Sequence, residues 1–160
     1  IAAPGWLSFM DGQRANAAQS QAIQVMRRAQ SQAIKNKRTM EVGFREEDDR
    51  LQVAYYTADD TPKPGWIDLP EGNSEQITID EANSNLTGKG CKASDATYCV
   101  RFISRGELDP EWLNVTGAGG EVGKITFLTK AAKENGPQRC VIVSTILGTM
   151  RTDRDEGCTQ

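Results

Sequence analysis

The chain has 160 residues, a formal net charge of −3 and a pI of about 5.1. That length suits one domain with its own core, and the acidic balance argues against binding nucleic acid or anionic lipid over the whole surface. The sequence has no histidine, which excludes Ser-His-Asp and Cys-His catalytic sites and removes the commonest metal ligand. We therefore expect a protein that is not an enzyme and that carries no cofactor.

The first predicted element is a helix over residues 13–38. Small apolar residues recur there at spacings of three and four and form one stripe, which comprises Ala18, Ala22, Val25, Ala29 and Ala33. Neither glycine nor proline interrupts the segment, and alanine favours the helix more than any other residue. Because small side chains let a neighbour approach the helix axis closely, we expect this stripe to pack against a sheet.

A period of two replaces the helical pattern after residue 38 and predicts an antiparallel hairpin, 40–44 with 51–55, joined by a charged turn. Further short strands are predicted at residues 66–69, 76–80, 98–104, 123–128, 140–146 and 149–154, the last two forming a hairpin that turns near Gly148. One helix followed only by strands indicates an α+β fold with antiparallel sheets. We expect residues 1–38 and the β-rich segment 39–160 to form one structural domain.

The four cysteines are Cys91, Cys99, Cys140 and Cys158. The chain lacks a Cys-x-x-Cys motif as well as histidine, so a zinc site is disfavoured and disulfides formed in an oxidising compartment are favoured. Four cysteines allow three pairings, of which we prefer the sequential one, Cys91–Cys99 and Cys140–Cys158, because short loops close readily. The predicted disulfides imply export.

Two segments rich in charge or glycine each have two interpretations. Residues 45–50, REEDDR, are a solvated hairpin turn or else a calcium or partner site, although the calcium-loop spacing is missing. Residues 117–124, GAGGEVGK, are a strand connector or a phosphate loop, although the phosphate-loop pattern is incomplete. We prefer the first interpretation of each.

Two basic groups also have two interpretations. The end of the predicted helix carries a set of cations that complement the helix dipole or meet an acidic partner, namely Arg27, Arg28, Lys35, Lys37 and Arg38. Near the chain end, Arg151 and Arg154 offer a nucleic-acid contact on an otherwise ordinary hairpin. Three carboxylates offset their charge, those of Asp153, Asp155 and Glu156.

Several segments together resemble the minor pilins and minor pseudopilins of the GspH/FimT type, which belong to type IV pili and type II secretion systems. The closest match is the N-terminal stretch, IAAPGWLSF followed by RANAAQSQAIQVMRRAQSQAIKNKR and TMEVGF. The second anchor is the pair GKITF and CVIVSTILGTMR near the end. The resemblance implies a pilin-like fold, with residues 1–38 as the lower half of the long helix and a β-sandwich globular head.

The resemblance also implies a structural and assembly role. Members of this family are made with a leader that is cleaved before the new N-terminus is methylated, and their first apolar half-helix sits in the inner membrane and later in the filament core. Ile1 would lie near the end of that half. The expected partners are other pilin or pseudopilin subunits, contacted through the N-terminal helix. Before assembly, the head is expected in the periplasm. After assembly, it is expected in a filament that is either periplasmic or extracellular.

DNA uptake is the alternative function that the resemblance suggests. Uptake pilins of the FimT kind carry Gly-Arg-x-Arg near the segment that here reads Gly148, Thr149, Met150 and Arg151. Thr149 stands at the first arginine of that pattern and only Arg151 matches the second. We therefore expect an assembly subunit, with DNA bound weakly or not at all.

Overall fold

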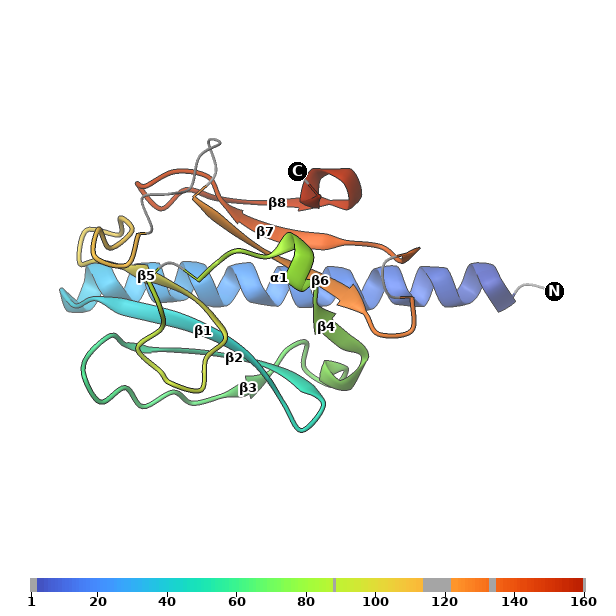
Figure 1. The fold of residues 1–160 in the computed structure, drawn as a ribbon, viewed down its shortest axis with the longest axis horizontal. Helices are drawn as coiled ribbons and strands as arrows, with labels where there is room; N and C mark the ends of the chain where they lie inside the picture. The colour runs from blue at the N-terminus through green and yellow to red at the C-terminus, as the bar shows by residue number, and fades with distance from the viewer. Residues whose placement is uncertain (1–2, 88, 114–121, 133–134, 160) are drawn as a thin grey trace.

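The computed structural model describes residues 3–87, 89–113, 122–132 and 135–159. In this part of the chain, one long helix lies against a head of short strands (Figure 1). The elements are α1 (Ala3–Asn36), β1 (Met40–Glu47), β2 (Arg50–Thr57), β3 (Ile67–Asp68), β4 (Ile77–Ile79), β5 (Tyr98–Phe102), β6 (Gly123–Thr129), β7 (Arg139–Val143) and β8 (Met150–Arg154). Short 3₁₀ turns include η1 (Ser74–Gln76), η2 (Glu81–Asn83) and η4 (Asp155–Cys158).

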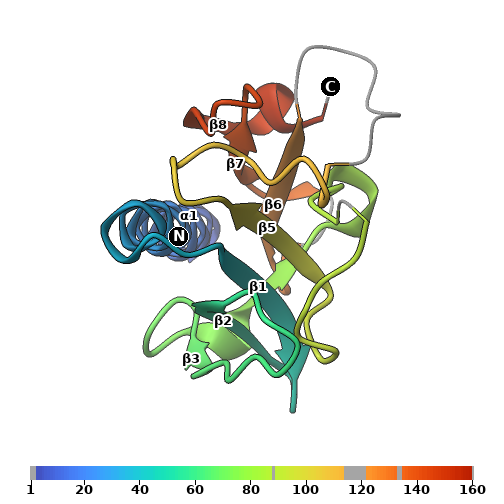
Figure 2. The same cartoon turned by 90° about the vertical axis from the view of Figure 1, so that its left-hand side faces the viewer.

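The strands form two four-stranded antiparallel sheets, with the orders β3-β2-β1-β5 and β4-β6-β7-β8. Figure 2 looks along the helix and shows both sheets on the same side of it. One apolar cluster joins the helix to both sheets, and Phe44 of β1 and Phe127 of β6 meet inside it with ring centroids 6.2 Å apart. The predicted α+β class, a long helix packed on antiparallel sheets, is confirmed.

The helix begins at Ala3, earlier than residue 13, where the periodicity alone places its start. Pro4 falls in the first turn, where the missing N–H has no intrahelical partner to lose. Gly12 lies inside the helix, at a cost of about 1 kcal/mol relative to alanine, which the long helical context tolerates. At the other end, Lys37 has φ 55° and the N–H of Arg38 donates to the carbonyl of Ala33 at 3.2 Å. This left-handed cap ends the helix at Asn36, short of the predicted residue 38.

The predicted hairpin is present and longer than expected. β1 and β2 pair from Met40–Thr57 to Glu47–Arg50 around Asp48 and Asp49, which both have positive φ, as a two-residue hairpin turn of right-handed twist requires. The final hairpin pairs β7 with β8 in the predicted place. Of the glycine-rich segment 117–124, residues 117–121 lie outside the described residues, and Gly123 and Lys124 begin β6.

Candidate interaction surface of the helix and the C-terminal strand

The alanine stripe of α1 faces the sheets. Ala18, Ala22, Ala29 and Ala33 have no exposed surface, whereas Val25 is half-buried at the margin of the same contact. Met26 completes the buried face. Since an alanine methyl fills little space, the strands approach the helix closely along this whole line, and any larger side chain here meets backbone or core atoms.

Two glutamines on α1 fasten the helix at two points. Gln19 Nε2 donates to the carbonyls of Cys140, at 2.9 Å, and Asp153, at 2.7 Å, which are paired residues on β7 and β8. Gln30 Nε2 donates to the carbonyls of Gly106, at 2.7 Å, and Gly148, at 3.0 Å. No pattern in the sequence marks either glutamine, because an amide on a helix surface ordinarily faces water.

A close approach of backbone makes the Gln30 contact possible. A Cβ added to Gly148 would lie 2.5 Å from Gly106 O and 2.5 Å from Gln30 Nε2, and both glycines have positive φ. Glycine is therefore needed at both turns, for conformation and for space. The helix end, the loop after β5 and the β7–β8 turn meet at this one point.

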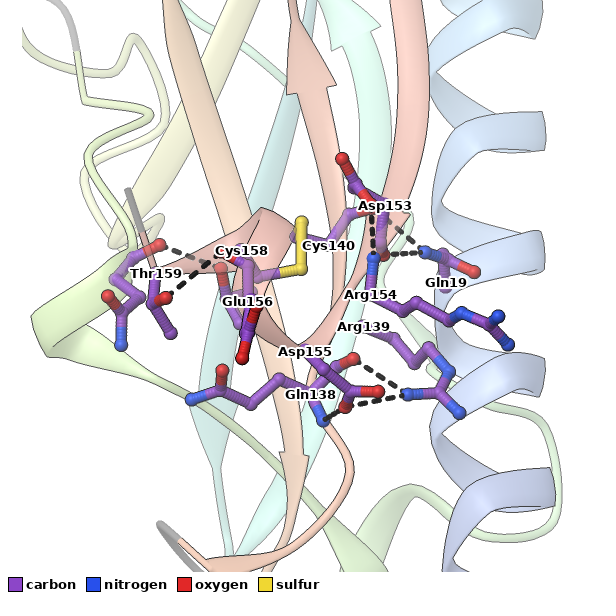
Figure 3. The surroundings of a disulfide bond; sticks show 12 residues. Gln19, Gln138, Arg139, Cys140, Asp153, Arg154, Asp155, Glu156, Cys158 and Thr159 are labelled. Atoms are coloured by element: carbon purple, nitrogen blue, oxygen red, sulfur yellow. Dashed lines mark hydrogen bonds and ion pairs between the residues drawn. A yellow bond between two sulfur atoms is a disulfide. The ribbon is translucent and has the colours of Figure 1, made fainter.

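The second cysteine pair closes the C-terminal end of the head. Cys140 of β7 is bonded to Cys158 of η4, with Cα atoms 5.8 Å apart, and both are buried with Ile142 on the sheet face away from α1. Figure 3 shows the disulfide on one side of the strands and the Gln19 contact on the other side, toward the helix. The bond ties η4, and with it the chain end, to the middle of the second sheet.

The first pair, Cys91–Cys99, has Cα atoms 5.7 Å apart and links the 86–97 loop to β5. A buried charged cluster fixes the same loop. Glu41 is fully buried and pairs with Arg101 Nη2 at 2.8 Å, while the backbone N–H of Lys92, within the loop, donates to Glu41 Oε1 at 2.7 Å. Arg101 also donates to the carbonyl of Gly90 at 3.2 Å.

Tyr56 and Asp109 complete this buried cluster. Tyr56 Oη donates to Glu41 Oε1 at 2.8 Å, and Arg101 reaches Asp109 at 3.4 Å. Burial, and then the neighbouring Glu41 carboxylate, raise the pKa of the Tyr56 phenol well above its ordinary value. Tyr56 therefore stays a neutral donor. The residues of the cluster come from three strands and a loop, so no local sequence pattern announces them.

Arg151 and Arg154 lie on opposite faces of β8. Arg151 pairs in register with Ile142 on the outer face, and its Nη1 is 2.9 Å from Asp153 Oδ2. Arg154 pairs in register with Arg139 on the face toward α1. The N–H of Arg154, and then the Arg151 side chain, lower the pKa of Asp153. The two arginines proposed as a joint nucleic-acid contact therefore do not converge.

The carboxylates of the 45–50 turn are drawn apart by separate partners. Glu47 pairs with Arg45, Asp49 with Lys130 at 2.8 Å, and Glu46 accepts the N–H of Ile79 at 3.2 Å. Within the described ranges, no group of three or more acidic or cysteine side chains is arranged to hold a metal ion. The basic residues at the end of α1 are all exposed, namely Arg27, Arg28, Lys35, Lys37 and Arg38.

The first turns of α1 carry large exposed apolar side chains. Trp6, Leu7 and Phe9 are 62%, 61% and 55% exposed, and the rings of Trp6 and Phe9 lie 6.1 Å apart. Figure 1 shows this part of the helix extending beyond the head. No helix in the described part of the chain combines the length and the apolar character that crossing a membrane requires.

No protein-family model and no curated protein matches the chain. Among solved structures, the minor pseudopilin EpsH from the type 2 secretion system of Vibrio cholerae matches with a TM-score of 0.54 at 15% sequence identity, over 88% of this chain and 96% of that one. The type IV minor pilin FimU of Pseudomonas aeruginosa matches with a TM-score of 0.51 at 16% identity, over 91% of this chain and 92% of that one. The chain thus has the fold of these proteins, and the pilin-like fold that the sequence resemblance implies is confirmed.

Proposed function

We propose that this protein is a minor pilin or minor pseudopilin, a structural and assembly subunit of a type IV pilus or of a type II secretion pseudopilus. The observation that carries the proposal is the exposed apolar group Trp6, Leu7 and Phe9 on the part of α1 that projects past the head. Exposed aromatic and aliphatic side chains on one surface are typical of a buried protein contact in an assembly. The fold shared with EpsH and FimU supports the same role.

In this proposal the projecting helix packs among the helices of neighbouring subunits. A segment preceding Ile1 anchors the protein in the inner membrane before assembly, and the head lies in the periplasm and afterwards in the filament. The two disulfides support a location outside the cytoplasm, because oxidising compartments are where such bonds persist. No residue is proposed to act in catalysis.

Site-specific photocrosslinking in the cell of origin tests this proposal. The full-length protein carries p-benzoylphenylalanine in place of Trp6, and a matched variant carries it in place of Ile67, an exposed residue on the edge strand β3. We expect the first variant to crosslink to other pilin-like subunits, in a fraction that contains sheared filaments or the secretion machine. Crosslinks to unrelated proteins only, or equal crosslinking from both positions, would contradict the assembly role.

DNA binding stays the weaker alternative. Its candidate residues, Arg151 and Arg154, face opposite sides of β8, and Arg151 is already paired with Asp153. Phosphate binding needs cations that reach the same backbone. The geometry therefore favours the assembly role over the receptor role.

A further inference from the structure

An open recess lies between α1 and the C-terminal strand. Its volume is about 290 Å³, and it is lined by Asn16, Gln19, Arg139, Thr152, Asp153 and Arg154. The helix supplies one wall, and the two arginines come from β7 and β8. Figure 3 shows the side chains of Arg139 and Arg154 both directed toward the helix.

The two arginines are direct cross-strand neighbours, since Arg139 and Arg154 are partners in the β7–β8 register. Like charges directly opposite one another in a sheet repel and destabilise the pair. One carboxylate offsets part of this repulsion, because Arg139 Nη1 is 3.3 Å from Asp155 Oδ1. The two arginines are therefore neighbours on one face of the sheet, and only Arg139 has an ion pair with Asp155.

Arg139 is held in place by its neighbours. Its Nε donates to Asn16 Oδ1 at 2.6 Å, and its Nη1 donates to the carbonyl of Gln138 at 2.8 Å. Its side chain is only 13% exposed. Arg139 is therefore a pre-positioned cation on a wall of the recess, and the amide of Asn16 is oriented with it.

Arg154 is the second cation of the recess, and its side chain is less constrained than that of Arg139. Among the residues that the structure describes, its guanidinium makes no hydrogen bond or ion pair. The nearby carboxylate of Asp153 instead accepts the Arg154 N–H at 2.9 Å and the Arg151 side chain at 2.9 Å. A planar guanidinium with free donors beside a second, fixed guanidinium is suited to binding an oxyanion.

We propose that this recess binds a carboxylate of a neighbouring subunit, an inference that rests on the proposed filament role. Charge complementarity carries it: Arg139 is paired with Asp155 and Asp153 with Arg151, whereas Arg154 has no ion pair among the described residues, so an incoming carboxylate would meet a cation that is not already paired. A polyanion fits less well, because Asp153 lines the recess and Asp155 lies beside Arg139, and both carboxylates would repel further phosphates. The recess also flanks α1 next to its projecting end, where neighbouring subunits of the proposed filament would lie.

The chemistry of the recess is testable on the 160-residue chain alone. The Nε–Hε resonances of Arg139, Arg151 and Arg154 are followed by NMR while sodium acetate is added, with sodium chloride at equal ionic strength and inorganic phosphate as separate titrations. We expect the resonances of Arg139 and Arg154 to shift and the shifts to saturate as acetate is added. The resonance of Arg151, on the other face of β8, is expected to shift by less than about one tenth as much.

Arg154→Ala is the informative variant, because it removes a side chain that makes no hydrogen bond or ion pair within the described part of the chain. We expect it to weaken acetate binding about five-fold or more, while Arg151→Ala leaves binding unchanged. Non-saturating shifts, equal shifts at all three arginines, or the same shifts with chloride would overturn the site. Phosphate binding more than about ten-fold tighter than acetate would overturn the carboxylate assignment.

A second crosslinking position separates this proposal from the filament role. In the full-length protein, p-benzoylphenylalanine in place of Thr152 lines the recess, whereas the same group in place of Arg151 faces the other side of β8. We expect Thr152 to crosslink to a peptide of another subunit that contains Asp or Glu. Crosslinks to subunits from Trp6 but none from Thr152 would remove the carboxylate site and leave the filament role standing.

Discussion

Glu41 and Arg101 form a buried ion pair, with Arg101 Nη2 2.8 Å from Glu41 Oε2 and the Glu41 side chain without any exposed surface. Removing Arg101 leaves the Glu41 carboxylate buried without an opposite charge, because its remaining donors, Tyr56 Oη and the N–H of Lys92, are neutral. Arg101→Ala should therefore lower the free energy of unfolding by about 3–5 kcal/mol, measured by guanidinium chloride denaturation. Arg105→Ala, which breaks an exposed pair with Glu107, is the control and should cost under about 1 kcal/mol. Equal losses would contradict a special role for the buried pair.

Tyr56 should make the free energy of unfolding fall as the pH rises into the alkaline range. Because the pKa of its phenol is raised in the folded protein, the folded state keeps a proton that the unfolded state releases near pH 10. The contribution of Tyr56 is complete below that pH and is lost as the pH rises above it. We expect the free energy of unfolding to fall by up to about 1.4 kcal/mol per pH unit from this group. Tyr56→Phe should flatten the decline, and an unchanged slope would contradict the assignment.

Gln19 and Gln30 should contribute more to the free energy of unfolding than glutamines on a helix surface ordinarily do. Each amide satisfies two backbone carbonyls of the head. We expect Gln19→Ala and Gln30→Ala each to cost about 1–2 kcal/mol in thermal or denaturant unfolding. Gln24→Ala, on the exposed face of the same helix, should be within about 0.5 kcal/mol of the wild type. Loss of stability in Gln24→Ala alone would refute the two-point attachment.

The alanine stripe should not accept larger side chains. Ala22→Leu and Ala29→Leu add three carbons where no surface is exposed, so each should cost about 1–3 kcal/mol through overpacking. Ser20→Leu makes a comparable enlargement at an exposed position of the same helix and serves as the control. If both alanine variants melt at the wild-type temperature, α1 does not dock by this face.

Duplex DNA should bind weakly. At about 0.15 M salt, we expect no sub-micromolar affinity of the chain for a labelled duplex in a fluorescence anisotropy titration. Thr149→Arg adds a cation two positions from Arg151 and should strengthen residual binding, while Arg151→Ala should abolish it. Arg154→Ala should have no effect, because Arg154 faces α1. Sub-micromolar binding by the wild type would favour the receptor role over assembly.

Periodicity predicted the fold well, because the helix and the strands each bury one face. The stripe from Ala18 to Ala33 and the alternation from Met40 to Phe44 both follow from which side chains avoid water. Periodicity did not predict the start of α1, since Gly5 and Gly12 weaken the helical signal without abolishing the helix. Local composition indicates the class of an element better than its ends.

The residues that join distant elements were not predictable from the sequence. Glu41 lies between Met40 and Val42 and reads as the solvent-facing position of a half-buried strand, yet the 86–97 loop covers it. Its partner Arg101 is 60 positions away. Gln19 and Gln30 likewise read as surface glutamines. Such contacts depend on where loops cross a sheet, and no spacing in the chain records that.

The attachment of α1 at two separated points also determines how the protein bears tension. At 1.5 Å per residue, Gln19 and Gln30 lie about 16 Å apart along the helix axis. A pull on the projecting end of α1 is directed along that axis, so both amide contacts and the alanine stripe resist it together, in shear. Contacts loaded in shear carry a force together. Contacts that are peeled apart carry it one at a time. A pull along α1 would therefore load the two amide contacts and the alanine stripe in parallel, and would not open them one after another.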